Sequence, residues 1–396
     1  MLRIRALSWK VWTVVLCGTV LLVAGGSAYF YFSADPARAV ALCKTSNNKP
    51  LCYSDIIEGI LRSEGIPAAF DALAASYDTD PDFAGTCHAV THELGDVAYD
   101  EFEETGETEL SSKASYCGYG FYHGFMDALY LETNDMEKAR SFCSYVGAAM
   151  PYSPTARLAE GSCYHGIGHG VTDGTDPRLW GDVVAIIKPG LALCAKVAVG
   201  NREWQKRCAS GVFNALGNMY PDPKFKLDQG TNPYELCRTV PLAEVERESC
   251  YDQMNTQAAV LGHDDLKAIV GFTNTIAEPY YRQTALRSAL AYYIQILKWK
   301  QKSLPPAEAQ VCDVPSQELK ESCVSGFVDG IMEFGLPGQQ YKEILQLCAS
   351  EAFPRDFRHF CFFSLQANAQ QYYTEDLVRR VCAGVPAEYR SAQCQS

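Results

Sequence analysis

The chain has 396 residues, which suffices for one long repeat array or about two or three compact domains. Hydrophobic residues make up 47% of it and charged residues 20%, a composition that is typical of folded proteins and excludes a predominantly disordered chain. The formal net charge at pH 7 is -13. Because an acidic surface repels phosphate groups, we expect no nucleic-acid partner.

An uncharged, mostly apolar stretch from Val11 to Phe32 follows a short basic segment at residues 1–10. A helix of this length, rising about 1.5 Å per residue, crosses the roughly 30 Å hydrocarbon layer of a bilayer. Basic residues before such a helix favour a cytoplasmic N-terminus. The sequence therefore predicts a cytoplasmic tail at 1–10, a transmembrane signal-anchor helix at 11–32 and an extracytoplasmic domain (periplasmic, extracellular or lumenal) at 33–396. A cleaved signal peptide is the alternative, although no clean small-residue cleavage site follows the stretch.

The 17 cysteines favour the same topology. Cys17 lies inside the predicted span, and the other sixteen all follow it, an even number that is typical of an oxidising compartment. Sequence alone allows many pairings, but short closed loops make neighbouring cysteines the simplest partners. This rule predicts eight disulfides: Cys43–Cys52, Cys87–Cys117, Cys143–Cys163, Cys194–Cys208, Cys237–Cys250, Cys312–Cys323, Cys348–Cys361 and Cys382–Cys394. The second of these pairs fits the rule least well, because it encloses an acidic stretch instead of a short turn.

The spacing of the cysteines indicates a repeat of about 38 residues with two helices per unit. In most units we expect one helix to end at the first cysteine and the second cysteine to open the next helix. Between the second cysteines of successive pairs, the one long gap is the 73 residues from Cys250 to Cys323. It spans about two repeats and predicts a unit without cysteines around 279–299. The predicted fold is all-α: a right-handed α-solenoid of helix-pair repeats stapled by about eight disulfides and preceded by one transmembrane helix.

One segment, "ETNDMEKARSFCSYVG", resembles the second helix of Sel1-like repeats, which are relatives of tetratricopeptide repeats. The resemblance lies in the run from Asp135 to Ala139 (DMEKA) and covers a few residues of one unit. It implies architecture only: helix-pair repeats of a family that serves as protein-interaction scaffolds, some of them exported and stapled by disulfides.

Four units align on their second cysteine as "CGYGFYHGFMDA", "CYHGIGHGVTDG", "CASGVFNALGNM" and "CVSGFVDGIMEF". Small residues recur three and seven positions after the cysteine, on one face of a helix, where they let a neighbouring helix approach closely. The pairs that consist of two glycines are Gly120/Gly124, Gly166/Gly170 and Gly326/Gly330.

Positions two, six and ten after the same cysteine share another face, since residues four apart on a helix are neighbours. We call these positions the polar column. Its members are Tyr119, His123 and Asp127; His165, His169 and Asp173; Ser210, Asn214 and Asn218; Ser325, Asp329 and Glu333; and, in a fifth unit shifted by one residue, His88, His92 and Asp96. Five of the seven histidines thus fall in one register on three consecutive units.

Histidines four residues apart on a helix can present two imidazoles to one metal ion. We therefore predict a transition-metal site, for zinc, copper or iron, within residues 87–173. The predicted ligands are His88, His92, His123, His165 and His169. The aspartates one turn farther along, Asp96, Asp127 and Asp173, are expected to orient the imidazoles or to bind the ion themselves.

Glu93 follows His92 directly, as the general base does in the His-Glu-x-x-His motif, and is our candidate catalytic base, although the second histidine of that motif is missing. His263 and His359 lie outside the register, and we expect them on the surface. The sequence predicts a membrane-anchored extracytoplasmic metal-binding protein and leaves open whether it is an enzyme.

The alternative is a non-catalytic scaffold whose concave face binds a protein or a glycan. In that case the histidines are structural and form a hydrogen-bonded polar ladder between stacked helices. Imidazoles that converge on a common point favour the metal site, whereas imidazoles that fan outward favour the scaffold.

Overall fold

The computed structural model describes residues 36–394 apart from 81–82, 84–85, 106–107, 112, 115, 134, 150–152 and 301. Every regular element within these residues is a helix, so the all-α prediction is confirmed. The predicted anchor at 11–32 lies outside the described residues. Among the described helices, none combines the length and the apolar character that crossing a bilayer requires.

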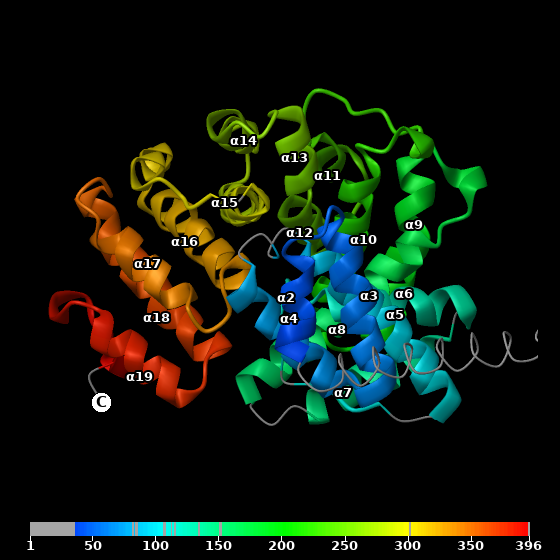
Figure 1. Cartoon of the computed structure of the whole chain (residues 1–396). Helices are drawn as coiled ribbons and strands as arrows, with labels where there is room; N and C mark the ends of the chain where they lie inside the picture. The colour runs from blue at the N-terminus through cyan, green and yellow to red at the C-terminus, as the bar shows by residue number, and fades with distance from the viewer. Residues whose placement is uncertain are drawn as a thin grey trace, which may run out of the picture.

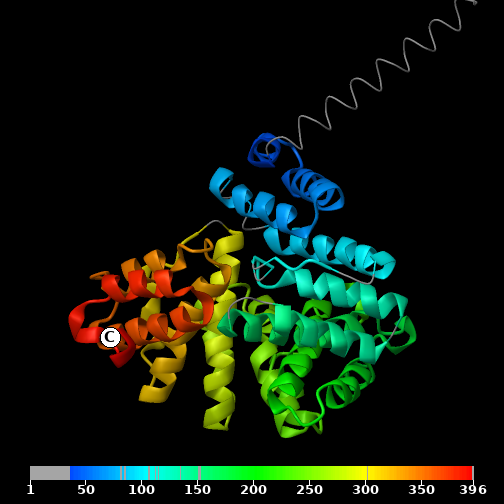
Figure 2. The ribbon, with the colours of Figure 1, turned by 90° about the horizontal axis from the view of Figure 1, so that it is seen from below.

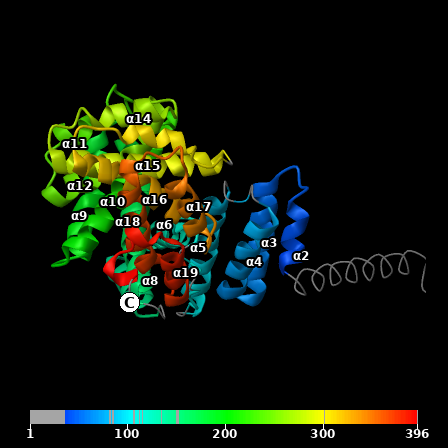
Figure 3. The same cartoon turned by 90° about the vertical axis from the view of Figure 1, so that its left-hand side faces the viewer.

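The first part of the described chain folds into seven helices, coloured blue to green in Figure 1. They are α2 (Pro36–Cys43), α3 (Lys49–Glu64), α4 (Ile66–Thr79), α5 (Cys87–Thr105), α6 (Gly120–Glu132), α7 (Met136–Ala149) and α8 (Ser153–Asp173). Figure 3 shows that α2, α3 and α4 form one end of the array, well apart from α11 and α14.

The remaining helices continue along the same array. The middle part holds α9 (Val183–Val197), α10 (Arg202–Met219), α11 (Glu235–Thr239), α12 (Glu244–Gln253), α13 (Asn255–Leu261) and α14 (Leu266–Thr273). The last part holds α15 (Pro279–Trp299), α16 (Gln317–Phe334), α17 (Gln340–Ala349), α18 (Arg358–Tyr372) and α19 (Glu375–Gly384).

Eight of these helices form a continuous inner row, in which each packs on the next: α5, α6, α8, α10, α12, α15, α16 and α18. The other helices flank this row, as α7 flanks α8, α9 flanks α10 and α17 flanks α18. The row follows a curved path, visible in Figure 2 as the succession from cyan through green and yellow to red. Its last helix, α18, returns to contact α8, so the C-terminal repeats lie beside the N-terminal ones.

All eight predicted disulfides are present, each between sequence neighbours. Such a disulfide content is typical of an oxidising compartment outside the cytoplasm. The predicted cysteine-free unit is also confirmed, because α15 takes the place between α12 and α16 in the inner row.

The expectation that the second cysteine opens a helix is wrong for most units. Cys208 lies well inside α10, which begins at Arg202, and Cys323 lies well inside α16. Capping side chains set these helix starts instead: Asn201 accepts hydrogen bonds from the first backbone N–H groups of α10, and Ser316 does so for α16. The disulfides of these units therefore hold the inner helix within its length and not at its first residue.

The small residues of the repeat bring the inner helices close together, as predicted. A β-carbon on Gly124 would lie 1.9 Å from the carbonyl oxygen of His92, and one on Gly211 would lie 1.9 Å from that of His165. In the C-terminal part, a β-carbon on Gly326 would lie 2.3 Å from a backbone oxygen of α15. Only glycine allows these approaches, which place the polar columns of adjacent helices side by side.

Candidate metal centre

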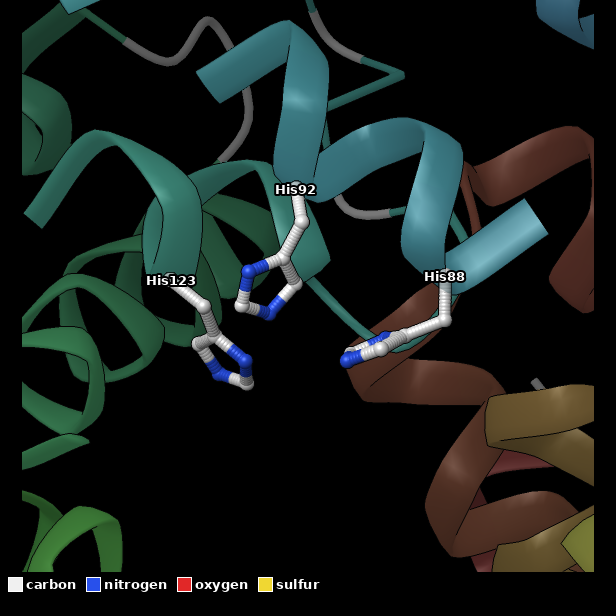
Figure 4. A group of neighbouring side chains, drawn as sticks. All are labelled: His88, His92 and His123. Atoms are coloured by element: carbon white, nitrogen blue, oxygen red, sulfur yellow. The ribbon is translucent and has the colours of Figure 1, made fainter. Parts of the chain in front are cut away.

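Three histidines from two adjacent inner helices converge. His88 and His92 lie one turn apart on α5, and His123 lies on α6. Figure 4 shows their rings directed toward a common space. One ring nitrogen from each lies within 4.8 Å of the others, and the ring centroids are 5.0 to 5.5 Å apart. We call these residues the three-histidine group.

The backbone fixes which nitrogen of His88 is available to a ligand. Nδ1 of His88 lies 2.7 Å from the carbonyl oxygen of Cys117. Because a carbonyl only accepts, Nδ1 carries the hydrogen and donates it, which leaves the lone pair on Nε2. The disulfide between Cys87 and Cys117 holds that carbonyl beside the start of α5. Orientation of an imidazole by a backbone carbonyl in this way is typical of metal ligands.

A second group lies on α6 and α8 and consists of Asp127, His169 and Asp173. One ligand atom from each lies within 4.8 Å of the others. Nδ1 of His169 is 2.9 Å from Oδ2 of Asp173 and 3.6 Å from Oδ1 of Asp127. His169 is only 7% exposed, whereas Asp173 lies at the exposed end of α8. We call these residues the aspartate–histidine group.

The two groups adjoin each other. Oδ2 of Asp127 lies 3.7 Å from Nδ1 of His92 in the three-histidine group. The ring of His123 stacks on that of His169, with centroids 5.1 Å apart and planes inclined by 12°. The five histidines therefore form one cluster but do not converge on one point.

His165 belongs to neither group. Its ring stacks against His123 with centroids 4.9 Å apart, and its Nδ1 lies 3.3 Å from the hydroxyl oxygen of Ser210. That hydroxyl donates its own hydrogen to the carbonyl of Arg207, so it accepts one from His165. This contact holds the ring in place and leaves Nε2 of His165 without a hydrogen.

Several buried polar atoms at the centre have no hydrogen-bond partner among the described residues. They are Nδ1 of His123, Nδ1 of His169 and Oδ1 of Asp127. Nδ1 of His169 and Oδ2 of Asp173 are close enough for an ion pair, but their geometry is not that of a hydrogen bond. Leaving a buried polar atom unsatisfied costs about 1–3 kcal/mol, which a bound ligand would recover.

Burial keeps most of the imidazoles neutral. Burial, with smaller contributions from neighbouring histidines, lowers the pKa of His92 to about 2 and that of His165 to about 3. The pKa values of His88 and His123 are lowered for the same leading reason. Neutral imidazole is the form that binds metal, so these side chains are ready to act as ligands at pH 7.

The pKa of His169 is shifted in the opposite direction. Burial acts to lower its pKa, but the carboxylates of Asp173 and Asp127 together outweigh burial and raise the pKa to about 10. Without an ion, His169 is therefore protonated at neutral pH and balances part of the negative charge of the two aspartates.

The curvature of the array brings an acidic side chain from the C-terminal repeats to the three-histidine group. A β-carbon on Gly118 would lie 3.5 Å from Nδ1 of His88 and 3.9 Å from Oε1 of Glu333 on α16. Burial, followed by the nearby Asp329, raises the pKa of Glu333 to about 7. A carboxyl group with such a pKa is suited to proton transfer at neutral pH. Glu333 is in the register of the polar column, but its position beside His88 depends on a curvature that the sequence does not reveal.

The other predicted site residues lie outside both groups. Glu93, the candidate base, is exposed and contacts Glu58 on α3. Asp96 is exposed one turn farther along α5. His263 and His359 are exposed, as expected.

No protein-family model, no curated protein and no solved structure matches the chain. The resemblance to Sel1-like repeats therefore stays a prediction, and a function has to be inferred from the geometry of the two groups.

Proposed function

We propose that the protein binds a transition metal ion, zinc, copper or iron, through His88, His92 and His123. The observation that carries the proposal is the convergence of three neutral, inward-facing imidazoles within 4.8 Å. We further propose that the helical array is a right-handed α-solenoid, held outside the cytoplasm by an anchor helix at 11–32.

The spacing of the ligands supports this proposal. Two nitrogens that bind one tetrahedral ion at 2.0–2.1 Å lie about 3.3 Å apart. Side-chain rotations that move each ring nitrogen by roughly 1 Å would therefore bring the three histidines around one ion. His88 and His92 share one helix, and Gly124 brings α6 to within van der Waals contact of that helix beside His123. Little of the scaffold has to move when the ion binds.

Three protein ligands leave a coordination position for water or a substrate, as in catalytic rather than structural zinc sites. An ion held by these three histidines would lower the pKa of a water bound to it and so supply a nucleophile near pH 7. We propose Glu333 as the group that exchanges a proton with that water, because its pKa is raised to about 7 and its carboxylate approaches the Nδ1 side of His88. Glu93 is less suited, because it is exposed and contacts Glu58 on α3.

Elemental analysis tests the proposal. The full chain, produced in an oxidising compartment and purified in detergent, is stripped with a chelator, reloaded with zinc and freed of excess ion. We expect at least about one equivalent of tightly bound zinc, since a preformed site of neutral imidazoles binds divalent ions strongly. The double variant His88→Ala/His92→Ala should lose the ion of this site, whereas His263→Ala, an exposed histidine outside the column, should retain it.

Less than about a tenth of an equivalent of zinc in the unaltered chain would contradict the proposal. Three neutral imidazoles this close together should bind an ion when metal is in excess. That result would favour the scaffold that binds a protein or a glycan on its concave face, with the histidines as structural residues.

A further inference from the structure

We propose that the aspartate–histidine group holds a second divalent transition ion, and that the carboxylate of Asp127 bridges the two ions. This inference rests on the proposed ion at the three-histidine group. It assigns Asp127, His169 and Asp173 a direct ligand role and makes the centre dinuclear.

The orientation of Asp127 is the main argument. Its Oδ2 faces Nδ1 of His92 at 3.7 Å, and its Oδ1 faces Nδ1 of His169 at 3.6 Å. One carboxylate therefore points an oxygen at each group. This orientation allows the carboxylate to bind one ion with each oxygen.

Buried polar atoms without hydrogen-bond partners favour a ligand at the same place. Oδ1 of Asp127 and Nδ1 of His169 are both buried and have no hydrogen-bond partner among the described residues. They face each other across a distance that is too long for a hydrogen bond. An ion between them would satisfy both, and Asp173 would supply the third ligand from the end of α8.

The packing of α8 against α6 is adapted to this arrangement. A β-carbon on Gly170 would lie 2.8 Å from Oδ1 of Asp127 and 3.0 Å from the carbonyl oxygen of Met126. Glycine at this position therefore leaves the room that the carboxylate occupies. Gly170 adjoins His169 in the sequence, so the close approach that accommodates Asp127 also brings the imidazole to it.

The charges of the two groups are complementary to two ions. The three-histidine group contributes no negative charge, whereas Asp127 and Asp173 contribute two. Two divalent ions about 3.5–4 Å apart repel each other strongly, and a shared carboxylate offsets part of that repulsion. One imidazole with two carboxylates suits harder ions such as manganese, iron or zinc, while three imidazoles also suit copper.

The competing explanation is an ion pair without metal, in which protonated His169 lies between two aspartates. Both explanations accommodate the distances, and they differ in the number of ions bound. They also predict different effects of removing the charge of Asp173, because only a metal site would lose an ion. Asp173 is exposed, so its replacement by asparagine should not impair folding.

The experiment is a titration of the metal-free full chain with Co(II), followed by visible absorption and by elemental analysis after gel filtration. The unaltered chain should bind about two equivalents, Asp173→Asn should bind about one, and the matched control Asp313→Asn should bind about two. Asp313 is a suitable control because its side chain is 79% exposed and pairs with Lys320, outside the column.

One equivalent in the unaltered chain would overturn the second site and leave the first intact, and two in Asp173→Asn would overturn the ligand role of Asp173. No binding at all in the unaltered chain would instead overturn the proposed function. Electron paramagnetic resonance of the loaded unaltered chain gives a readout that needs no variant. A shared carboxylate should couple the two Co(II) spins, so the signal per ion should fall when the second equivalent is added; two independent signals would overturn the bridge.

Discussion

The polar column has a different character in the two parts of the molecule. In the later repeats, Asn214 and Asp329 of the column have hydrogen-bond and ion-pair partners on neighbouring helices. Asn214 on α10 donates to Gln253 on α12 at 3.2 Å. Asp329 on α16 pairs with Arg287 on α15 and accepts a hydrogen bond of 2.9 Å from Asn368 on α18. This part of the column is a polar ladder between stacked helices, which is what the scaffold hypothesis predicts.

In the earlier repeats the same register leaves buried atoms without partners. His123, Asp127 and His169 each have one such atom, and all three lie within the cluster. Because both parts share one repeat geometry, the difference cannot come from the backbone register. It comes from the side chains, and it is a reason for our proposal that the earlier part of the column binds a ligand.

The largest effect that we expect comes from Gly124→Ala. The new β-carbon would lie 1.9 Å from the carbonyl oxygen of His92, so α5 and α6 must move apart. We expect a loss of about 3 kcal/mol or more in the free energy of unfolding, together with a loss of metal, since His92 and His123 separate. Urea unfolding and elemental analysis measure the two effects.

Two matched variants sharpen this comparison. Gly326→Ala forces α16 away from α15 and should destabilise the chain to a similar extent without loss of metal. Gly271→Ala on α14 meets no atom within 4 Å and should stabilise the protein by about 0.5–1 kcal/mol. If Gly326→Ala also released the metal, the two parts would be more strongly coupled than the comparison implies.

The next largest effect that we expect is on the stability of the metal-free protein in acid. The pKa of His92 is about 2 in the folded chain and about 6.5 in the unfolded chain, so below pH 6.5 the unfolded state binds a proton that the folded state does not. Stability should therefore fall as the pH decreases, by up to about 1.4 kcal/mol per pH unit for this group. His92→Gln should reduce that slope, measured by urea unfolding between pH 6.5 and pH 4, and His263→Gln should not. An unchanged slope in His92→Gln would show that His92 is already solvated.

His169 should act at the other end of the pH range. Its pKa is raised to about 10, so the stability that it contributes is complete below pH 6.5 and is lost as the pH rises toward 10. His169→Gln should remove this loss of stability at alkaline pH from the metal-free protein. The loss of stability at acid pH, which comes from the other histidines, should remain. Thermal unfolding between pH 7 and pH 10 measures it. A decline of equal size in the variant would mean that the ion pairs of His169 do not stabilise the fold.

The sequence predicts well what depends on local spacing. The disulfide pairs, the glycines at helix contacts and the register of the histidines all follow from short loops and from four-residue helical periodicity. The division of the histidines into two groups depends on how α5, α6 and α8 are rotated about their axes, which the register does not specify. The position of Glu333 beside His88 depends on the accumulated curvature of the inner row, to which every unit contributes.

The smallest effect concerns the later part of the column. Asp329→Ala removes one hydrogen bond from Asn368 and the ion pair with Arg287, in which the arginine side chain is 53% exposed and the aspartate 20%. Such a partly exposed pair contributes little, so we expect a loss of only about 1 kcal/mol in the free energy of unfolding. Zinc content should stay unchanged, because the aspartate belongs to the ladder and not to the proposed metal centre. A loss of zinc in Asp329→Ala would instead show that the later repeats help to form the centre, through the neighbouring Glu333, and would make the division between the two parts one of degree.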